Sequence, residues 1–211
     1  MAQDTPPAAK GLVLRSHARY YDLVTGLLSF GHGRIPYARL AELARIAPGE
    51  RVLDVGCGTG SLAVAAQALA GAAGIVCGID ASVPMLERAR RKARRLGVPI
   101  DFRRGAAEAL PFAGGSFDVA CSTLMLHHLP RPMRRQCVSE MARVLAPGGR
   151  VLVVDYEIPS VQQNGWLARL HRHRAVAVEE VQSLLQDAGF QLRDGGTVHG
   201  TGMHFTLAMR A

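Results

Sequence analysis

The run VLDVGCGTGSL, residues 52–62, contains the residue types and the spacing that most directly predict chemistry in this chain. Strand-forming residues break into three alternating glycines, Gly56, Gly58 and Gly60, and a helix-forming stretch follows. Glycines at such a turn let the backbone approach a ligand closely, and turns of this kind bind nucleotides. Hydride carriers, phosphate donors and methyl donors all use them, so the neighbouring residues must distinguish between these ligands.

Two acidic residues narrow the choice of ligand. A dinucleotide turn has the spacing G-x-G-x-x-G, but Ser61 stands at its third glycine position, and no G-K-[ST] sequence of a phosphate-binding loop follows. Asp54 precedes the glycines, where a carboxylate facing the crevice repels a pyrophosphate and suits a cation. Asp80 ends the next apolar run, where an acid accepts hydrogen bonds from two ribose hydroxyls. The acids therefore favour a cationic nucleoside such as S-adenosylmethionine over a nicotinamide cofactor.

Alternating strands and helices must position these residues. Strands are predicted at 51–55, 75–80, 99–105, 116–123, 148–157, 190–198 and 203–210. Helices are predicted at 16–28, 36–46, 61–70, 82–97, 133–145 and 178–189. This alternation indicates an α/β fold with a mainly parallel sheet covered on both faces, and the last two strands form an antiparallel hairpin. Ligands of such sheets bind beyond the carboxyl ends of the strands.

Several motifs, in order, resemble those of class I S-adenosylmethionine-dependent methyltransferases. VLDVGCGTG resembles the first signature of that family, and the later matches are GIDASVPMLERAR (78–90), GAAEALPF (105–112), FDVACSTLMLHHL (117–129) and RVLAPGGRVLVVD (143–155). The resemblance implies a Rossmann-like seven-stranded sheet in the order 3-2-1-4-5-7-6, with strand 7 antiparallel, helices on both faces and an N-terminal helical lid. The predicted cofactor is S-adenosyl-L-methionine, and its product is S-adenosyl-L-homocysteine.

The same resemblance implies which residues bind the cofactor. Asp80 would hold the ribose and Met85 would lie against the adenine. Ala106 stands where many relatives have an Asp that bonds the adenine amino group, which leaves the amide of Ala107 and the carboxylate of Glu108 as candidates for that contact. The predicted cofactor-binding residues are Asp54, Gly56, Cys57, Gly58, Gly60, Asp80, Ala81, Met85, Ala106, Ala107, Glu108, Ser122 and Tyr21.

A narrower resemblance lies upstream, in RYYDLVTGLLSFGHGR (19–34). This stretch is similar to the entry segment of the ubiquinone/menaquinone C-methyltransferase-like branch (methyltransferase type 11), and phosphatidylethanolamine N-methyltransferases have comparable Tyr-Asp segments. The resemblance implies a lid that brings Tyr21 to the methionine end of the cofactor; an amphipathic packing helix is the alternative. The predicted organisation is a flexible tail at 1–15 and one methyltransferase domain at 16–211, with the lid at 16–47.

His127 and His128 follow the predicted fourth strand, where a side chain reaches the transferred methyl group. An imidazole there can deprotonate a phenol or an activated carbon acceptor, since its pKa lies near neutrality. His127 and Tyr21 are therefore the candidate catalytic residues, and capping of the next loop is the alternative role for a histidine. No metal site is predicted: the His-rich run 171–174 lacks an acid or cysteine to complete a ligand set.

Composition and charge limit the partners. The 211 residues are 48% hydrophobic and 20% charged, as in a globular protein, and the buried-looking cysteines are expected to be free thiols. The net charge of +8 comes from arginine clusters at 87–97, 130–136 and 168–174, which suit an anionic membrane surface or form solvated helix faces. No interleaved aromatic residues support nucleic-acid binding. Without a membrane-spanning run or signal peptide, a cytoplasmic location is expected, with peripheral membrane contact as an option.

The acceptor is the least determined feature. The predicted reaction is methyl transfer to a small or lipophilic acceptor, either a quinone-like ring or a phospholipid headgroup. The alternatives are an RNA or protein methyltransferase and, from another class, a catalytically inactive S-adenosylmethionine-binding module. Only about twenty residues, 158–177, separate the fifth strand from the next helix. The acceptor pocket is then smaller than in quinone methyltransferases, more open, or completed by a second subunit in a homodimer.

Overall fold

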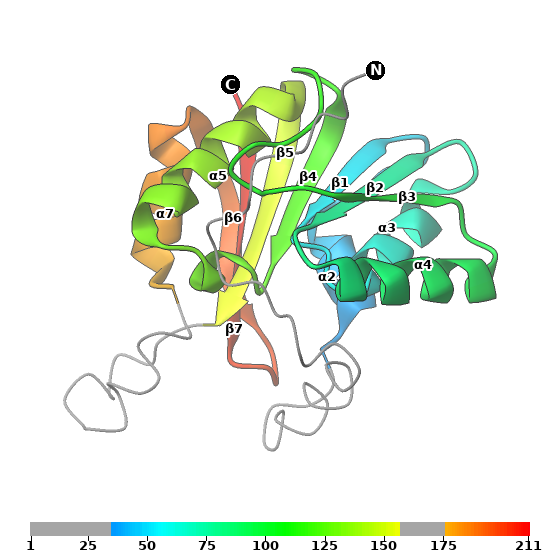
Figure 1. Cartoon of the computed structure of the whole chain (residues 1–211). Helices are drawn as coiled ribbons and strands as arrows, with labels where there is room; N and C mark the ends of the chain where they lie inside the picture. Colours follow the sequence, from blue (N-terminus) through cyan, green and yellow to red (C-terminus); the bar gives the residue numbers. More distant parts are fainter. Residues whose placement is uncertain (1–34, 157–175) are drawn as a thin grey trace.

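A computed structural model describes residues 35–156 and 176–211 of the chain (Figure 1). Its elements are α2 (Tyr37–Leu43), β1 (Arg51–Val55), α3 (Ser61–Ala70), β2 (Ile75–Asp80), α4 (Val83–Leu96), β3 (Ile100–Arg104), β4 (Phe117–Thr123), η1 (Leu126–His128), α5 (Arg131–Val144), β5 (Leu145–Tyr156), α7 (Val178–Asp187), β6 (Phe190–Val198) and β7 (Met203–Arg210). The predicted tail, most of the predicted lid including Tyr21, and the His-rich run lie outside the described residues. The domain boundaries stay a prediction.

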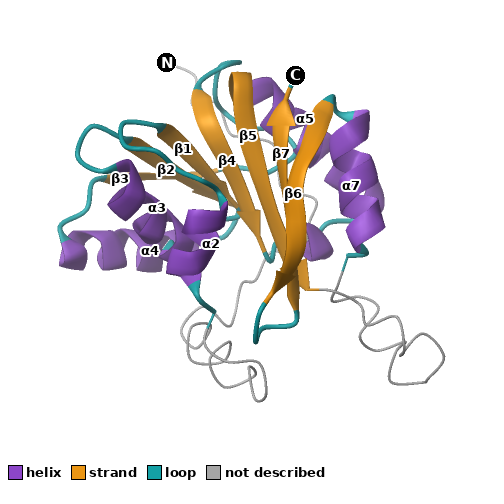
Figure 2. Cartoon of the chain, turned by 180° about the vertical axis from the view of Figure 1, so that it is seen from behind, coloured by secondary structure: helices purple, strands orange, loops and turns teal. Residues whose placement is uncertain are grey.

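The seven strands form one sheet in the order β3-β2-β1-β4-β5-β7-β6, which confirms the predicted order. β1 pairs in parallel with β2 and β4, and β7 runs antiparallel to both β5 and β6. Figure 2 shows the β6–β7 hairpin at one side of the sheet. The carboxyl ends of the parallel strands therefore meet at one edge, where the predicted ligand residues lie.

Helices cover both faces of the sheet, as expected. α2, α3 and α4 group on one side, whereas α5 and α7 lie on the other (Figures 1 and 2). Alternate residues of β1 belong to different cores because side chains of a strand point to opposite faces: Val52 packs with the α2–α3 side, and Leu53 and Val55 pack with the α5–α7 side. All four cysteines are buried and free.

The helix ends follow local backbone chemistry. α4 begins after Ser82 and ends at Gly97, which adopts a left-handed φ of 67°, as the sequence predicts. α2 ends at Leu43, earlier than the predicted end at residue 46. The reason is Arg45, which adopts a left-handed φ of 53° and donates its N–H to the carbonyl of Glu42 at 2.8 Å, a conformation that stops a helix.

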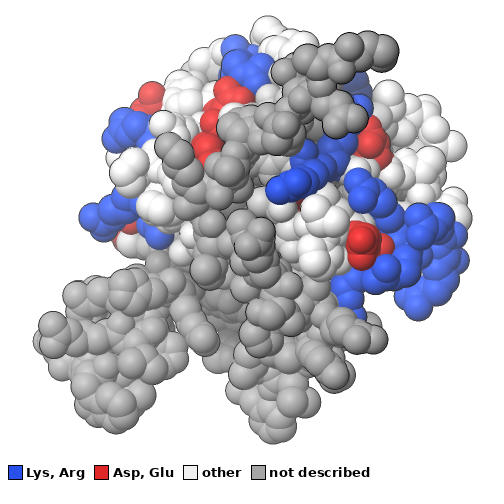
Figure 3. Space-filling model, in the orientation of Figure 1, with Lys and Arg blue, Asp and Glu red and all other residues white. Residues whose placement is uncertain are grey.

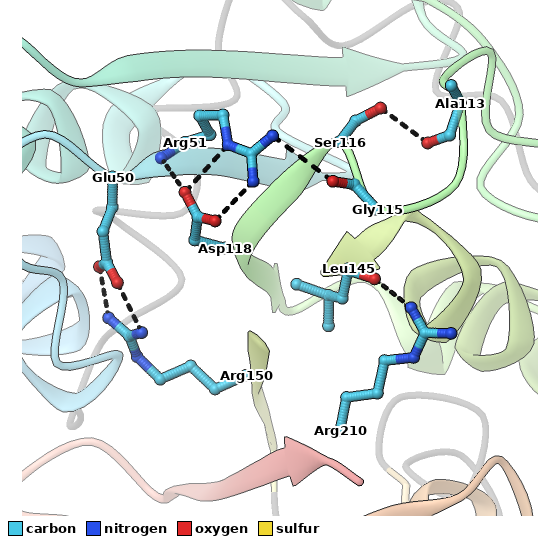
Figure 4. Close-up of polar contacts among 9 residues, drawn as sticks. All are labelled: Glu50, Arg51, Ala113, Gly115, Ser116, Asp118, Leu145, Arg150 and Arg210. Carbon is cyan, nitrogen blue, oxygen red and sulfur yellow. Dashed lines mark hydrogen bonds and ion pairs between the residues drawn. The ribbon is translucent and has the colours of Figure 1, made fainter. Parts of the chain in front are cut away.

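Ion pairs join the strands at the amino edge of the sheet, opposite the predicted site (Figure 4). Arg51, at the start of β1, bonds both carboxylate oxygens of Asp118 on β4, at 2.6 and 3.0 Å. Arg150 of β5 bonds Glu50 at 2.5 and 2.8 Å, with both side chains largely buried. Bidentate pairs of this kind are the stronger class of ion pair. They tie β1, β4 and β5 together far from the strands' carboxyl ends.

Candidate active site

The glycine turn after β1 is built from left-handed backbone. Gly56, Gly58 and Gly60 have φ values of 73°, 52° and 75°, which residues with a Cβ rarely adopt. The N–H groups of Gly56 and Cys57 both donate to the carbonyl of Ile79 on β2, at 2.8 and 2.9 Å. Gly60 is the N-cap of α3. The turn is thus fixed by its neighbouring strand and leads directly into a helix.

Asp80 ties the surrounding loops together at the end of β2. Its Oδ2 accepts the N–H of Gly58 at 2.9 Å, and its Oδ1 accepts the N–H of Ser82 at 2.7 Å. Its own carbonyl accepts the N–H of Gly105 at 3.1 Å. Burial raises the pKa of this carboxyl, and the two amide hydrogen bonds oppose the shift. Three segments that the sequence predicts to contact the cofactor therefore meet at one residue.

Asp54 lies beneath the turn. Only 2% of its surface is exposed. Its Oδ2 has no hydrogen-bond partner among the described residues. Burial raises its pKa to about 7; a hydrogen bond from the Ala63 amide opposes this rise, and the charge of Asp80 adds to it. An unpartnered buried carboxylate oxygen is costly unless a donor or cation reaches it.

The predicted adenine contacts lie beside these loops. Met85 is 2% exposed in the first turn of α4, and Ala81 precedes that helix half-buried. Ala106 is 6% exposed, and its carbonyl accepts the N–H of Ala109 at 3.2 Å, which folds the loop back on itself. The two residues between them are both half-buried: Ala107 and Glu108.

Helix α5 fixes the end of this loop. Glu140 accepts the N–H of Leu110 at 2.7 Å, and Arg143 donates to the carbonyls of Leu110 and Phe112 at 2.9 and 2.8 Å. Arg143 also pairs with Glu140, which lowers the pKa of that carboxyl. The loop between β3 and β4 is therefore positioned by α5, a helix that comes after β4 in the chain.

The end of β4 contacts the glycine turn. Ser122 is 1% exposed, is the register partner of Val55 at the end of β1, and has an Oγ with no partner among the described residues. Leu124 adopts a left-handed φ of 54°, a conformation that costs energy in a residue with a Cβ. The next residue, Met125, packs so closely on Gly56 that a Cβ there would lie 2.2 Å from its Cγ.

His127 forms a buried pair with Asp155. His127 Nδ1 lies 2.6 Å from Asp155 Oδ1, and the two side chains are 8% and 4% exposed. Asp155 also accepts the backbone N–H groups of His127 and Tyr156, at 3.2 and 2.8 Å. Because an ionised carboxylate only accepts hydrogen bonds, a neutral ring in this pair would carry its proton on Nδ1 and present a lone pair on Nε2. This is the arrangement of a general base held by an acid.

Two aromatic rings accompany the pair. The centroid of His128 lies 3.9 Å from that of His127, and the centroid of Tyr156 lies 6.1 Å away. The role of Asp155 was missed in the sequence because it is separated from His127 by a whole helix. The signal was available: an acid ends the fifth apolar strand, in the same way that Asp80 ends the second.

Comparison with known proteins agrees with this geometry. Residues 52–149 match a family model described as a methyltransferase domain. The chain is 36% identical, over 74% of its own length and 70% of the relative's, to a demethylmenaquinone methyltransferase of Thermus thermophilus. It is 33% identical to the ubiquinone/menaquinone biosynthesis C-methyltransferase UbiE of Blochmanniella floridana, over 70% of this chain but only 58% of that relative, less than two thirds of its length.

The fold has the same affiliation. A crystal structure of a SAM-dependent methyltransferase from Aquifex aeolicus superposes with a TM-score of 0.75 at 22% identity, covering 93% of this chain and 98% of that one. At 22% identity this similarity establishes the fold alone. The 36% identity to the Thermus relative establishes the family as well. The chain belongs to the class I S-adenosylmethionine-dependent methyltransferases.

Proposed function

We propose that the chain methylates a small, lipophilic, quinone-like acceptor and that His127 is its general base. The observation that carries this proposal is the His127–Asp155 pair, which follows β4 and β5 at the edge of the sheet where Met125 contacts the glycine turn. A base is required when the acceptor is a phenol or a ring carbon that must lose a proton.

The described residues fit the cofactor. Two buried polar atoms, Asp54 Oδ2 and Ser122 Oγ, have no partner within the described part of the chain and suit a ligand that carries hydrogen-bond donors. Among the described residues, only its own chain neighbours come within 4 Å of a Cβ built on Gly58, which leaves room for close approach. We infer that the residues after β1 hold the methionine half and that Asp80 holds the ribose. S-adenosylmethionine supplies an electrophilic methyl group there.

The chain's own residues handle the acceptor's proton. We infer that His127 Nε2 accepts this proton, so that the acceptor atom becomes the nucleophile for the methyl group. Asp155 keeps the opposite Nδ1–H oriented and stabilises the imidazolium that forms. Burial of both side chains strengthens this electrostatic effect because little water screens it. Alignment and exclusion of water supply the remaining acceleration.

A planar ring is the acceptor that the surroundings favour over a phospholipid headgroup. The ring of Tyr156 lies close to His127, and aromatic rings stack in offset arrangements at such separations. The relatives named above are methyltransferases of demethylmenaquinone and of ubiquinone/menaquinone biosynthesis. Both facts support a quinol ring, whose hydroxyl group activates the neighbouring carbon.

The test is a methyl-transfer assay with separate acceptors. The purified chain is incubated with S-adenosylmethionine and a chemically reduced desmethyl-naphthoquinol, with phosphatidylethanolamine vesicles, or with transfer RNA. We expect S-adenosylhomocysteine release and a gain of one methylene in mass with the quinol alone. Methylation of lipid or RNA in preference to the quinol would replace the proposal. Cofactor binding without turnover in any pool would identify an inactive binding module.

We further propose that the arginine face of α4 contacts an anionic membrane surface. Arg91, Arg94 and Arg95 are exposed there beside Leu96, which is 53% exposed. Figure 3 shows Lys and Arg gathered over α4 at the lower right. Within the described segments, no helix is sufficiently long and apolar to span a bilayer. Basic side chains near an anionic surface each contribute about 1 kcal/mol, and a lipophilic quinone is found in such membranes.

Vesicle flotation tests this contact. We expect the chain to float with vesicles containing anionic lipid at low salt, and to be released at high salt or by Arg94→Gln together with Arg95→Gln. The matched control is Arg39→Gln, because the Arg39 side chain is exposed on α2 rather than on α4; this substitution should leave flotation unchanged. Flotation that is insensitive to salt would contradict an electrostatic contact.

We also propose that a homodimer completes the acceptor pocket, since the segment after β5 is short. Sedimentation at the assay concentration tests this proposal.

A further inference from the structure

One buried arginine grips the turn that carries His127. Arg134 lies in the first half of α5, and its side chain is 13% exposed. Its Nε donates to the carbonyl of Leu126 at 3.1 Å and to the carbonyl of Leu129 at 2.9 Å. Leu126 is the first residue of η1, a short 3₁₀ turn of three residues, and Leu129 is the residue that follows it. The guanidinium therefore spans the turn from its first residue to the residue that follows it.

The far end of the Arg134 side chain is also fixed. Its Nη1 donates to Glu180 Oε1 at 2.8 Å, and Glu180 belongs to the first turn of α7. Glu180 is 24% exposed, so water only partly screens the pair. Held by a carboxylate at one end and two carbonyls at the other, the guanidinium links the turn to α5 and α7.

The turn depends on contacts from outside its own three residues: Arg134 on the carbonyls, Asp155 on the His127 N–H, and the buried packing of Leu126. A 3₁₀ helix of three residues has poor hydrogen-bond geometry and no independent stability. Its internal hydrogen bonds run from His128 N–H to the Met125 carbonyl and from Leu129 N–H to the Leu126 carbonyl, at 2.9 and 3.0 Å. The entry to the turn is also strained, since Leu124 adopts a left-handed φ. A small rotation of the turn would move His127 away from Asp155.

We infer that Arg134 is a positioning residue: it holds the turn so that His127 Nδ1 stays on Asp155 and Nε2 stays in its proton-accepting form. This inference rests on the proposed role of His127 as the base. Arginine is suited to the task because its planar group presents several donors at fixed angles, whereas a lysine ammonium is a single point charge on a flexible stem. Arg134→Lys therefore retains the charge and removes the fork.

The experiment is a double-mutant cycle with a spectroscopic readout. Arg134→Lys and Glu180→Gln are each compared with wild type and combined with His127→Gln. The matched control is Arg135→Lys, because Arg135 pairs with Asp187 of α7 at 3.1 Å and thus also joins α5 to α7, and this pair does not involve the turn. Methyl transfer to the quinol gives kcat, calorimetry gives the cofactor Kd, and ¹⁵N-edited spectra report the tautomer of His127.

We expect Arg134→Lys to lower kcat by about 10- to 100-fold, the cost of misplacing a reacting group, with an unchanged cofactor Kd. Glu180→Gln should act in the same direction with a smaller effect, and Arg135→Lys should change nothing. In the His127→Gln background, Arg134→Lys should lower the residual rate by less than about twofold. The wild-type spectrum should show the Nδ1–H tautomer, and Arg134→Lys should show a mixture.

Two results would overturn the inference. One is an additive loss of rate in the His127→Gln background, which would give Arg134 a role independent of His127. The other is an unchanged tautomer and kcat in folded Arg134→Lys. If His127→Gln itself retains full activity, the proposed base is wrong instead. The tautomer spectrum needs no acceptor, so it tests the positioning role even if the quinol is not methylated.

Discussion

Asp155 holds His127 at two points: Oδ1 lies 2.6 Å from the ring Nδ1, and Oδ2 accepts the backbone N–H of the same residue at 3.2 Å. One carboxylate thus sets both the direction of the imidazole and the position of the chain that carries it. Because the carboxylate only accepts hydrogen bonds, it also selects the tautomer. The orientation of His127, which lies in η1, is therefore set by a residue of β5.

Replacing Asp155 with Asn should therefore reduce catalysis without weakening cofactor binding. An amide N–H facing Nδ1 favours the opposite tautomer, which blocks Nε2 as a base. We expect kcat to fall by about 10²- to 10⁴-fold, the usual contribution of a general base. Quinol turnover and calorimetric cofactor titration measure the two effects. Asp187→Asn, at an exposed pair on α7, is the control. A kcat for Asp155→Asn close to that of wild type would refute the pair's role.

Asp80→Asn should have the opposite signature. Asp80 accepts the amides of Gly58 and Ser82, and an Asn at this position turns an N–H toward one of those donors. Loss of this charged acceptor costs about 1–3 kcal/mol, which corresponds to a rise of about 5- to 150-fold in the cofactor Kd. Calorimetry measures this rise. Asp101→Asn, on β3 beside exposed Arg103, should bind the cofactor normally. Equal affinities for both variants would contradict the placement of the ribose.

Two glycines of the turn should differ in their tolerance of alanine. At Gly58 an added Cβ meets no other described residue within 4 Å, so only the left-handed backbone opposes it, at about 1–2 kcal/mol. At Gly60 the same Cβ would lie 2.7 Å from the Phe102 ring and 3.0 Å from the Ala89 Cβ, which adds about 1–3 kcal/mol of overpacking. The free energy of unfolding, measured with urea, should be lower for Gly60→Ala than for Gly58→Ala. The reverse order would be inconsistent with the packing around α3.

Gly58→Ala should nevertheless bind the cofactor poorly. The space that its methyl group enters is the space proposed for the cofactor's approach to the backbone. We expect a folded protein with a raised cofactor Kd, measured by calorimetry. Normal affinity in this variant would place the ligand away from the turn.

Stability should depend on pH through Asp54. Burial raises its pKa to about 7, against 3.8 for an ordinary Asp, so the folded chain retains a proton that the unfolded chain releases. The resulting stability is complete below about pH 4 and is lost as the pH rises through about 7. In Asp54→Asn no side chain titrates at this position, so this pH dependence is removed. Urea unfolding should show the wild type losing stability relative to Asp54→Asn between about pH 4 and about pH 7. Parallel curves would disprove the shift.

Most strands and helices were predictable because local signals agree. β2, β6 and β7 have the predicted bounds, since each is an apolar or alternating run that ends at turn residues. α3 also has its predicted bounds, because alanine-rich sequence follows Gly60 and Gly71 ends it. The end of α2 was not predictable, because nothing in the residue type of Arg45 announces a left-handed conformation. β5 also begins at Leu145, before its predicted start at residue 148.

The site was predictable only where contacts are local. Gly58 and Asp80 follow neighbouring strands, so their proximity comes from the fold class itself. The partnership of His127 with Asp155, and of Arg134 with Glu180, depends on how a short turn and two helices pack, which no periodicity encodes. Asp54 was expected to face the crevice. Its burial under α3 reflects the close approach of that helix, which starts directly after the turn.

The separation of the bidentate ion pairs from the carboxyl edge has a consequence for evolvability. The ion pairs Arg51–Asp118 and Arg150–Glu50 brace the strands at the end opposite His127. We therefore expect substitutions in the loop after β4 to leave both ion pairs in place. Substitutions at Met125 or His128 leave these two ion pairs intact, although Met125 also packs on Gly56 and against the core. We expect that a few substitutions in these loops can change the acceptor preference while the ion pairs continue to brace the sheet.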